Sequence, residues 1–165
     1  MDSTVIGVFK SESQAERAVG ELRERGIRSE DVSVIARDDR RDRKTRGGEG
    51  DGGLRMGRQD VGEGVATGGA IGGAAGLLAG AGALAIPGVG PILAVGPLAA
   101  ALSGAVTGGI AGGLVDYGIP EQRGRHYEEQ VRQGSILAVV RCRREKVDEA
   151  SQILRRNGAS DVETH

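Results

Sequence analysis

Residues 65–115 read VATGGAIGGAAGLLAGAGALAIPGVGPILAVGPLAAALSGAVTGGIAGGLV, and the rest of the chain is organised around this stretch. It contains no charged side chain and consists mainly of glycine, alanine and aliphatic residues. Small residues recur at every fourth position on both sides of a proline- and glycine-rich break. The members of this repeat are Gly64, Gly68, Gly72, Gly76 and Gly80 in the first arm and Gly96, Ala100, Gly104, Gly108 and Gly112 in the second.

A four-residue period places the small residues on one helical face, where the backbone of a second helix can approach closely. The sequence therefore predicts a helical hairpin with arms at 65–86 and 92–115 and a glycine-zipper contact along this face. Glycine is a poor helix former, so packing or lipid must stabilise such helices. The residues assigned to the hairpin turn are Pro87, Gly88, Gly90 and Pro91.

Two settings remain open for this hairpin. Each arm is long enough to cross a hydrocarbon core of roughly 30 Å. The first arm has few large aliphatic side chains, however, so its predicted insertion energy is marginal. The alternative is burial in protein, either against its own domain or between copies in an oligomer. The expected partner of the hairpin is therefore membrane lipid or a second copy of the chain, and the protein is expected to be a homo-oligomer.

The N-terminal residues predict a β-α-β unit. A β-rich run at 4–9 precedes a helix that Ser11 and Gln14 open as a capping box and that Gly26 ends. A second β-rich run follows at 32–36, and a right-handed crossover would make the two strands parallel neighbours. No basic region followed by an apolar one starts the chain, so no signal peptide is expected. We expect a cytoplasmic protein that associates with the cytoplasmic membrane and is not secreted.

Residues 38–60 mix charges of both signs with glycine, which predicts a flexible linker. Attraction of its arginines to anionic lipid is an alternative, but the interleaved acidic residues weaken it. The net charge of −1 and the scarcity of aromatic residues argue against a nucleic-acid partner.

The C-terminal residues predict one more helix and a second β-α-β unit. The helix begins at Pro120 and ends at Gly134. The apolar run 136–140 is typical of a strand buried on both faces, and a helix over 145–157 and an edge strand over 161–164 follow it. A shift of 132 positions brings the apolar positions and the glycine cap of the first unit onto those of the second.

Two such units in one sheet predict an α+β fold, a ferredoxin-like sandwich interrupted by the helical hairpin. The predicted organisation is a first half at 1–37, a linker at 38–60, the hairpin at 61–118, and a helix with the second half at 119–165.

The sequence shows no catalytic constellation and calls for no cofactor. His126 and His165 have no Cys, Asp or Glu at ligand spacing, so no metal site is expected. Cys142 lies among Arg141, Arg143 and nearby basic residues, which could lower its pKa and make it a redox-sensitive thiolate. The competing interpretation, a small residue at a strand end, is favoured.

Several segments together resemble the bacterial general stress protein 17M-like family, also called heat-induced or low-temperature-induced stress proteins. The segments that carry the resemblance are 5–9, 11–18, 27–36, the glycine-rich insert, and 118–129. The resemblance implies a stress-associated role without an established enzymatic activity, so no catalytic residues are carried over.

The expected function is therefore that of a non-enzymatic general stress protein. Its cytoplasmic sandwich would associate with the membrane or with itself through the glycine-zipper hairpin. The alternative is a soluble regulatory module that binds a small effector, with the hairpin buried in an oligomer interface. No small-molecule ligand is assigned.

Overall fold

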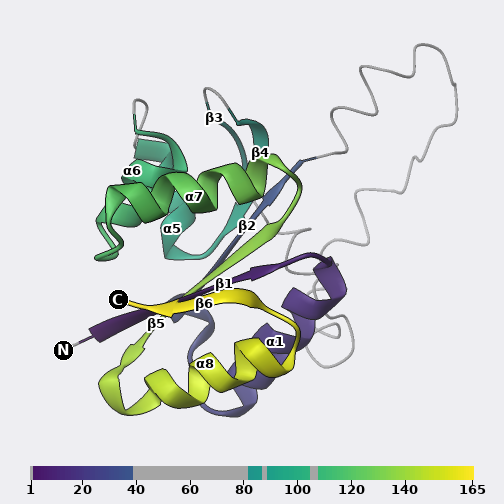
Figure 1. The fold of residues 1–165 in the computed structure, drawn as a ribbon, viewed down its shortest axis with the longest axis vertical. Coiled ribbons are helices and arrows are strands. Elements are labelled where there is room, and N and C mark those ends of the chain that lie inside the picture. Colours follow the sequence, from purple (N-terminus) through teal and green to yellow (C-terminus); the bar gives the residue numbers. More distant parts are fainter. Residues whose placement is uncertain (1, 39–81, 87–88, 105–107) are drawn as a thin grey trace, which may run out of the picture.

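The computed structural model describes residues 2–38, 82–86, 89–104 and 108–165, which form an antiparallel sheet with helices on both faces (Figure 1). The strand order in this sheet is β3-β4-β2-β5-β1-β6. The strands are β1 (Asp2–Phe9), β2 (Val32–Arg37), β3 (Gly82–Ile86), β4 (Gly90–Val95), β5 (Ile136–Arg143) and β6 (Ser160–Thr164). The helices are α1 (Glu12–Glu24), α5 (Pro97–Gly104), α6 (Gly109–Val115), α7 (Glu121–Arg132) and α8 (Val147–Arg156). The expected α+β class is confirmed at this level.

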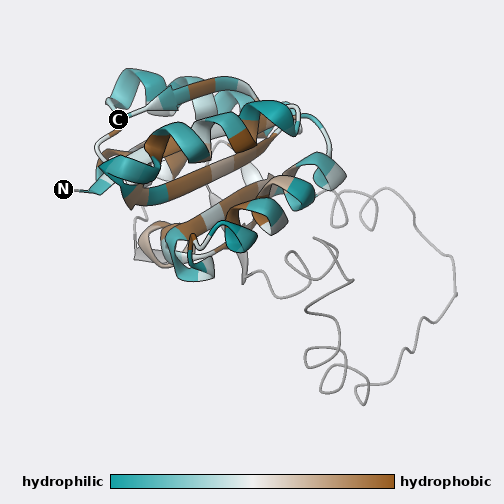
Figure 2. Ribbon diagram, turned by 90° about the horizontal axis from the view of Figure 1, so that it is seen from below, coloured by the Kyte–Doolittle hydropathy of each residue, from teal (hydrophilic) through white to brown (hydrophobic). Residues whose placement is uncertain are grey.

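The sheet is buried on both faces because α1 and α8 cover one side and α5, α6 and α7 cover the other (Figures 1 and 2). Alternate residues of β5 point to opposite layers, with Ala138 and Val140 toward α1 and α8 and Leu137 and Val139 toward α7. All four are at most 1% exposed. The prediction that the 136–140 run is buried on both faces is confirmed.

Both β-α-β units contain the predicted helices and strands. The Ser11 hydroxyl caps α1 by accepting a hydrogen bond from the Gln14 amide at 3.3 Å, as the capping box predicts. The expectation that the strands of a unit are neighbours is wrong, because β5 lies between β1 and β2 and pairs antiparallel with both. Likewise β1 lies between β5 and β6. The two units therefore interleave in one sheet.

The predicted helical arms are wrong at residues 82–86 and 92–95, which belong to the antiparallel strands β3 and β4. The chain reverses near the predicted turn, but it does so between two strands, with Ile86 opposite Gly90. Ile92 and Ala94 are buried while their neighbours in β4 are partly exposed, which is the two-residue period of a strand. β4 also pairs with β2, so this part of the chain extends the sheet.

Gly96, predicted to lie on a helix-packing face, is the residue that turns the chain from β4 into α5. Its φ is +92°, and a Cβ at this position would lie 2.3 Å from the Val32 carbonyl oxygen. Pro97 begins α5, and the Leu98 amide donates to the hydroxyl of Ser33 at 3.1 Å. Ser33 of β2 thus serves as the cap of a helix 65 residues away in the sequence.

The first predicted arm lies almost entirely outside the described residues. This applies to Gly64, Gly68, Gly72, Gly76 and Gly80, to Pro87 and Gly88 of the turn, and to positions 39–60 of the predicted linker. In the described parts of the chain, no helix combines the length and the apolar composition that a membrane span requires.

Candidate functional site

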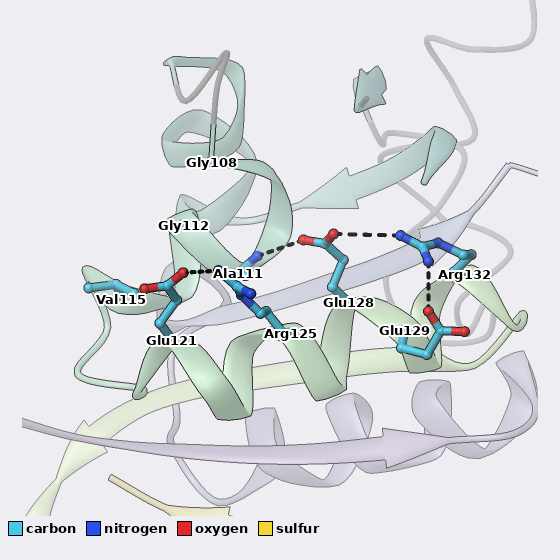
Figure 3. A pocket seen from close by; sticks show the side chains of 9 residues that line it. All are labelled: Gly108, Ala111, Gly112, Val115, Glu121, Arg125, Glu128, Glu129 and Arg132. Atoms are coloured by element: carbon cyan, nitrogen blue, oxygen red, sulfur yellow. Dashed lines mark hydrogen bonds and ion pairs between the residues drawn. The ribbon is translucent and has the colours of Figure 1, made fainter. Parts of the chain in front are cut away.

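A surface hollow of about 690 Å³ lies between α6 and α7 (Figure 3). Helix α6 contributes small or aliphatic residues and α7 contributes charged ones. The lining residues are Gly108, Ala111, Gly112, Val115, Glu121, Arg125, Glu128, Glu129 and Arg132. The hollow therefore has one apolar wall and one ionic wall.

The apolar wall exposes backbone and one aliphatic side chain. A Cβ at Gly112 would meet no atom within 4 Å, so this glycine leaves open space beside α6. Val115 lies at the end of the helix and is 48% exposed. Among the residues that the structure describes, no other large hydrophobic side chain is exposed. A neighbouring molecule could therefore bury apolar surface here.

The ionic wall is a stripe along one side of α7, since its residues recur at intervals of three and four. Arg125 Nη2 lies 2.6 Å from Glu121 Oε1, and Arg132 Nη1 lies 2.8 Å from Glu129 Oε2. Arg132 Nη2 is 3.9 Å from Glu128 Oε1, beyond hydrogen-bond length. The stripe thus carries three carboxylates and two guanidinium groups, which pair with one another along the helix.

Glu128 joins the two walls. Its Oε2 accepts a hydrogen bond from the Ala111 amide at 3.0 Å, and a Cβ at Gly109 would lie 2.8 Å from the same oxygen. The residue at the N-cap of α6 is Gly108, which has no side chain to satisfy the first amides of the helix. The Glu128 carboxylate supplies this cap from α7, and its charge also suits the positive end of the helix dipole.

Glu128→Ala is expected to lower the free energy of unfolding by about 1 to 2 kcal/mol, because it removes the cap of α6 and leaves the Ala111 amide without its acceptor. Glu129→Ala is the matched control, since Glu129 pairs with the same arginine but contacts no α6 amide in the described interactions. Urea denaturation of both variants measures the difference. Equal losses would show that the contact with Ala111 contributes nothing.

In the described part of the chain, two glycines outside the predicted set lie where helices meet. A Cβ at Gly113 would lie 2.8 Å from Leu102 Cδ2, and one at Gly124 would lie 3.0 Å from Ala111 Cα. Gly113 therefore sets the contact between α5 and α6, and Gly124 sets that between α6 and α7. Among the predicted set, Gly104 ends α5, while Gly108 and Gly112 line the hollow. Gly124 could have been found in the sequence, because a glycine inside an otherwise charged helix often marks a close contact.

A second polar cluster joins α7 to the edge strand β6. The Arg123 guanidinium makes a two-pronged ion pair with Glu163, and its carbon lies 5.5 Å from the centre of the Tyr127 ring. His126 Nε2 is 3.2 Å from Asp161 Oδ2, and His165 Nε2 is 3.2 Å from Glu163 Oε2. Both histidines thus have carboxylate partners. Asp161 is 35 residues from His126 and is brought to it by folding, whereas Glu163 is only two residues from His165.

This cluster holds α7 and β6 in place. Burial acts to raise the pKa of Glu163, but hydrogen bonds with Arg123, Tyr127 and His165 outweigh it and lower the pKa overall. In the described parts of the chain no three His, Cys, Asp or Glu side chains gather as a metal site would need. The residues present here support a structural ionic contact.

Cys142 does not have the low pKa that its basic neighbours in the sequence suggested. Burial raises the pKa of this thiol, and the nearby Asp2 and Asp31 carboxylates raise it further. The alternation of β5 explains the error, because Arg141 and Arg143 point outward while Cys142 points into the layer under α1 and α8. The burial of Cys142 thus favours the interpretation of a small residue at a strand end.

The hollow is suited to binding. Its lining side chains offer only carboxylates, guanidinium groups and aliphatic carbon, which can form ion pairs and bury apolar surface. No nucleophile with an adjacent base is among them.

Residues 4–85 match the family model described as heat induced stress protein YflT domain. The matched region includes most of β1, all of α1 and β2, and nearly all of β3. No curated protein and no solved structure matches the chain.

Proposed function

This chain belongs to the heat-induced stress protein YflT family through residues 4–85, and from that premise we propose that it is a non-enzymatic stress protein that works by self-association. The observation that carries the proposal is the hollow between α6 and α7. It combines the exposed Val115 and the open backbone at Gly112 with a charged stripe. An apolar centre beside polar and charged groups is the usual make-up of a protein–protein interface.

The described part of the glycine-rich segment supports this assignment. Ile92, Leu98, Ile110 and Leu114 are fully buried, so most of the aliphatic surface of the second predicted arm packs on the sheet of its own chain. The small-residue surface that remains exposed is the side of α6 at the hollow. Of the predicted glycine-zipper face, the described residues that could contact a second copy are Gly108 and Gly112 on this side of α6.

The test is the mass of the full-length protein in solution, measured by sedimentation equilibrium at ambient and at heat-shock temperature. The chain has a mass of 17.0 kDa, and we expect a species of twice this mass or a larger multiple. Val115→Lys should weaken the association, because it places a charge at the centre of the apolar wall. A protein that stays monomeric at high micromolar concentration would overturn the proposal.

Membrane association is a second candidate, carried by the uncharged sequence at 65–81. The deletion that tests it is 65–81 alone, since removing 65–115 would also take away β3, β4, α5 and α6. The membrane candidate predicts that the full chain stays in membranes washed with alkaline carbonate and that the deleted chain does not. If both chains are absent from the washed membranes, the membrane candidate fails.

We also propose that the two β-α-β units form a ferredoxin-like sandwich into which the segment between β2 and α7 is inserted. The support for this is the order β2-β5-β1-β6 with α1 and α8 together on one face.

Binding of a small effector in the hollow is the remaining alternative from the sequence, and a ligand that changes the oligomer mass would support it.

A further inference from the structure

We propose that the second copy docks antiparallel along α7, about a two-fold axis that passes between Arg125 and Glu128. This inference rests on the proposed self-association and specifies its surface and its register. The residues concerned are Glu121, Arg125, Glu128 and Arg132, four of the five charged residues of the ionic wall. The fifth, Glu129, pairs with Arg132 of its own chain.

The order of charges on this wall favours an antiparallel partner. In chain order the four residues are acidic, basic, acidic and basic, while Glu129 directly follows Glu128 and would lie opposite the partner's Gly124. Reversing the direction of the helix exchanges the signs, so an antiparallel copy places Glu121 opposite the partner's Arg132 and Arg125 opposite the partner's Glu128. The two-fold axis repeats each pair, as an interface between identical surfaces requires.

The spacing of the four residues also fits an antiparallel partner. The outer residues of the stripe are each four positions from the nearer inner residue, and the inner residues are three apart. This spacing is the same in both directions, so two antiparallel copies match along the whole stripe, which is about 16 Å long at 1.5 Å per residue. All four charges would then meet an opposite charge in a single register.

The charged groups of the stripe are accessible to a partner. The side chains of Glu121, Arg125 and Arg132 are 62%, 74% and 45% exposed, so their charged ends can reach a neighbouring molecule. Glu128 is 19% exposed and uses Oε2 to cap α6, while its Oε1 is 3.9 Å from the nearest Arg132 nitrogen. That oxygen can accept a hydrogen bond from the partner's Arg125.

Charge complementarity also favours a second copy over other occupants. A uniformly acidic partner would be repelled by Glu121 and Glu128, and a uniformly basic one by Arg125 and Arg132. Like charges brought together at an interface disfavour the wrong partner, so an alternating stripe selects a surface with the complementary alternation. The reversed stripe of the same chain is such a surface.

The test uses the full-length chain with Glu121→Arg, with Arg132→Glu, and with an equimolar mixture of the two variants. In a dimer of either variant alone, residues 121 and 132 carry the same charge, and the two-fold axis places two such pairs opposite each other. We therefore expect the dimer dissociation constant to rise at least about tenfold. In the mixed dimer, the arginine at 121 faces the partner's glutamate at 132, and the other pair is native. The mixture should therefore regain dimers of near wild-type affinity in sedimentation equilibrium.

The mixture separates docking from folding, because repulsion within one chain is not relieved by a second variant. Glu24→Arg is the matched control, since Glu24 is exposed on α1 on the opposite face of the sheet, and it should leave the dissociation constant unchanged. A mixture that remains as dissociated as the single variants would overturn the register. A wild-type dimer that neither variant weakens would overturn this surface but leave the proposed self-association intact. A monomeric wild-type protein would overturn both.

Discussion

Gly96→Ala is expected to lower the free energy of unfolding by about 3 kcal/mol or more, a large part of the stability of a small domain. Two costs add at this position. The φ of +92° is one that L side chains rarely adopt, which costs about 1 to 2 kcal/mol. In addition, the new Cβ would lie 2.3 Å from the Val32 carbonyl oxygen and 2.9 Å from Ser33 Cα. Both atoms belong to the backbone of a central part of the sheet, so neither can move aside cheaply.

Gly90→Ala provides the matched control for this prediction. Gly90 has a φ of +90°, but a Cβ there would have no atom within 4 Å. Its replacement should therefore cost only the backbone strain, about 1 to 2 kcal/mol. Urea denaturation monitored by circular dichroism measures both variants. If the two substitutions cost the same, the close approach of Gly96 to β2 is not what requires glycine there.

The two β-α-β units could be predicted from the sequence because their signals are local. Ser11, the cap of α1, is three residues from Gln14, whose amide donates a hydrogen bond to it. The apolar residues of α1 and α8 recur at helical spacing. The order of the strands could not be read in this way. The prediction that strands joined by a crossover are neighbours failed, because β5 lies between β1 and β2. Such pairing depends on contacts between residues more than 100 positions apart in the chain.

The glycine-rich segment shows the limit of periodicity as a guide. A four-residue glycine repeat fits a helix pair, but glycine adds little stability to a helix in water, and β2 has an edge with which β4 can pair. Sheet pairing prevails over the predicted helix at 82–86 and 92–95. Further on, α5 and α6 do form, but their caps come from Ser33 and Glu128, which no local motif identifies.

The candidate site was only half predicted. Gly108 and Gly112 belong to the predicted packing face and do line the hollow, whereas the charged stripe of α7 was not assigned any role. A stripe of mixed charge on a helix usually indicates a solvent-exposed face, and nothing in the sequence places it beside α6. The folded structure adds the missing information through Gly124, whose lack of a side chain lets α7 lie directly against Ala111.

Tyr127 of α7 is an ionisable side chain that is fully buried in the core between this helix and the sheet. Burial raises the pKa of its phenol to about 12, from an ordinary value near 10, and the neighbouring Glu163 carboxylate adds to this shift. Arg123 acts in the opposite direction and offsets part of it. The folded protein therefore retains this proton at pH values where the unfolded chain has lost it.

Wild-type protein is expected to lose about 2 to 3 kcal/mol of stability between pH 10 and pH 12 that Tyr127→Phe does not lose. Since the folded pKa lies above the unfolded one, the contribution of the neutral phenol is fully present below pH 10 and is lost as the pH rises through 12. Urea denaturation of both proteins across this range isolates the effect, because all other titrating groups are shared. Tyr117→Phe, at the other tyrosine, should retain the alkaline loss. Parallel pH profiles for wild type and Tyr127→Phe would contradict the assignment, since they would mean that the phenol ionises equally easily in the folded and the unfolded chain.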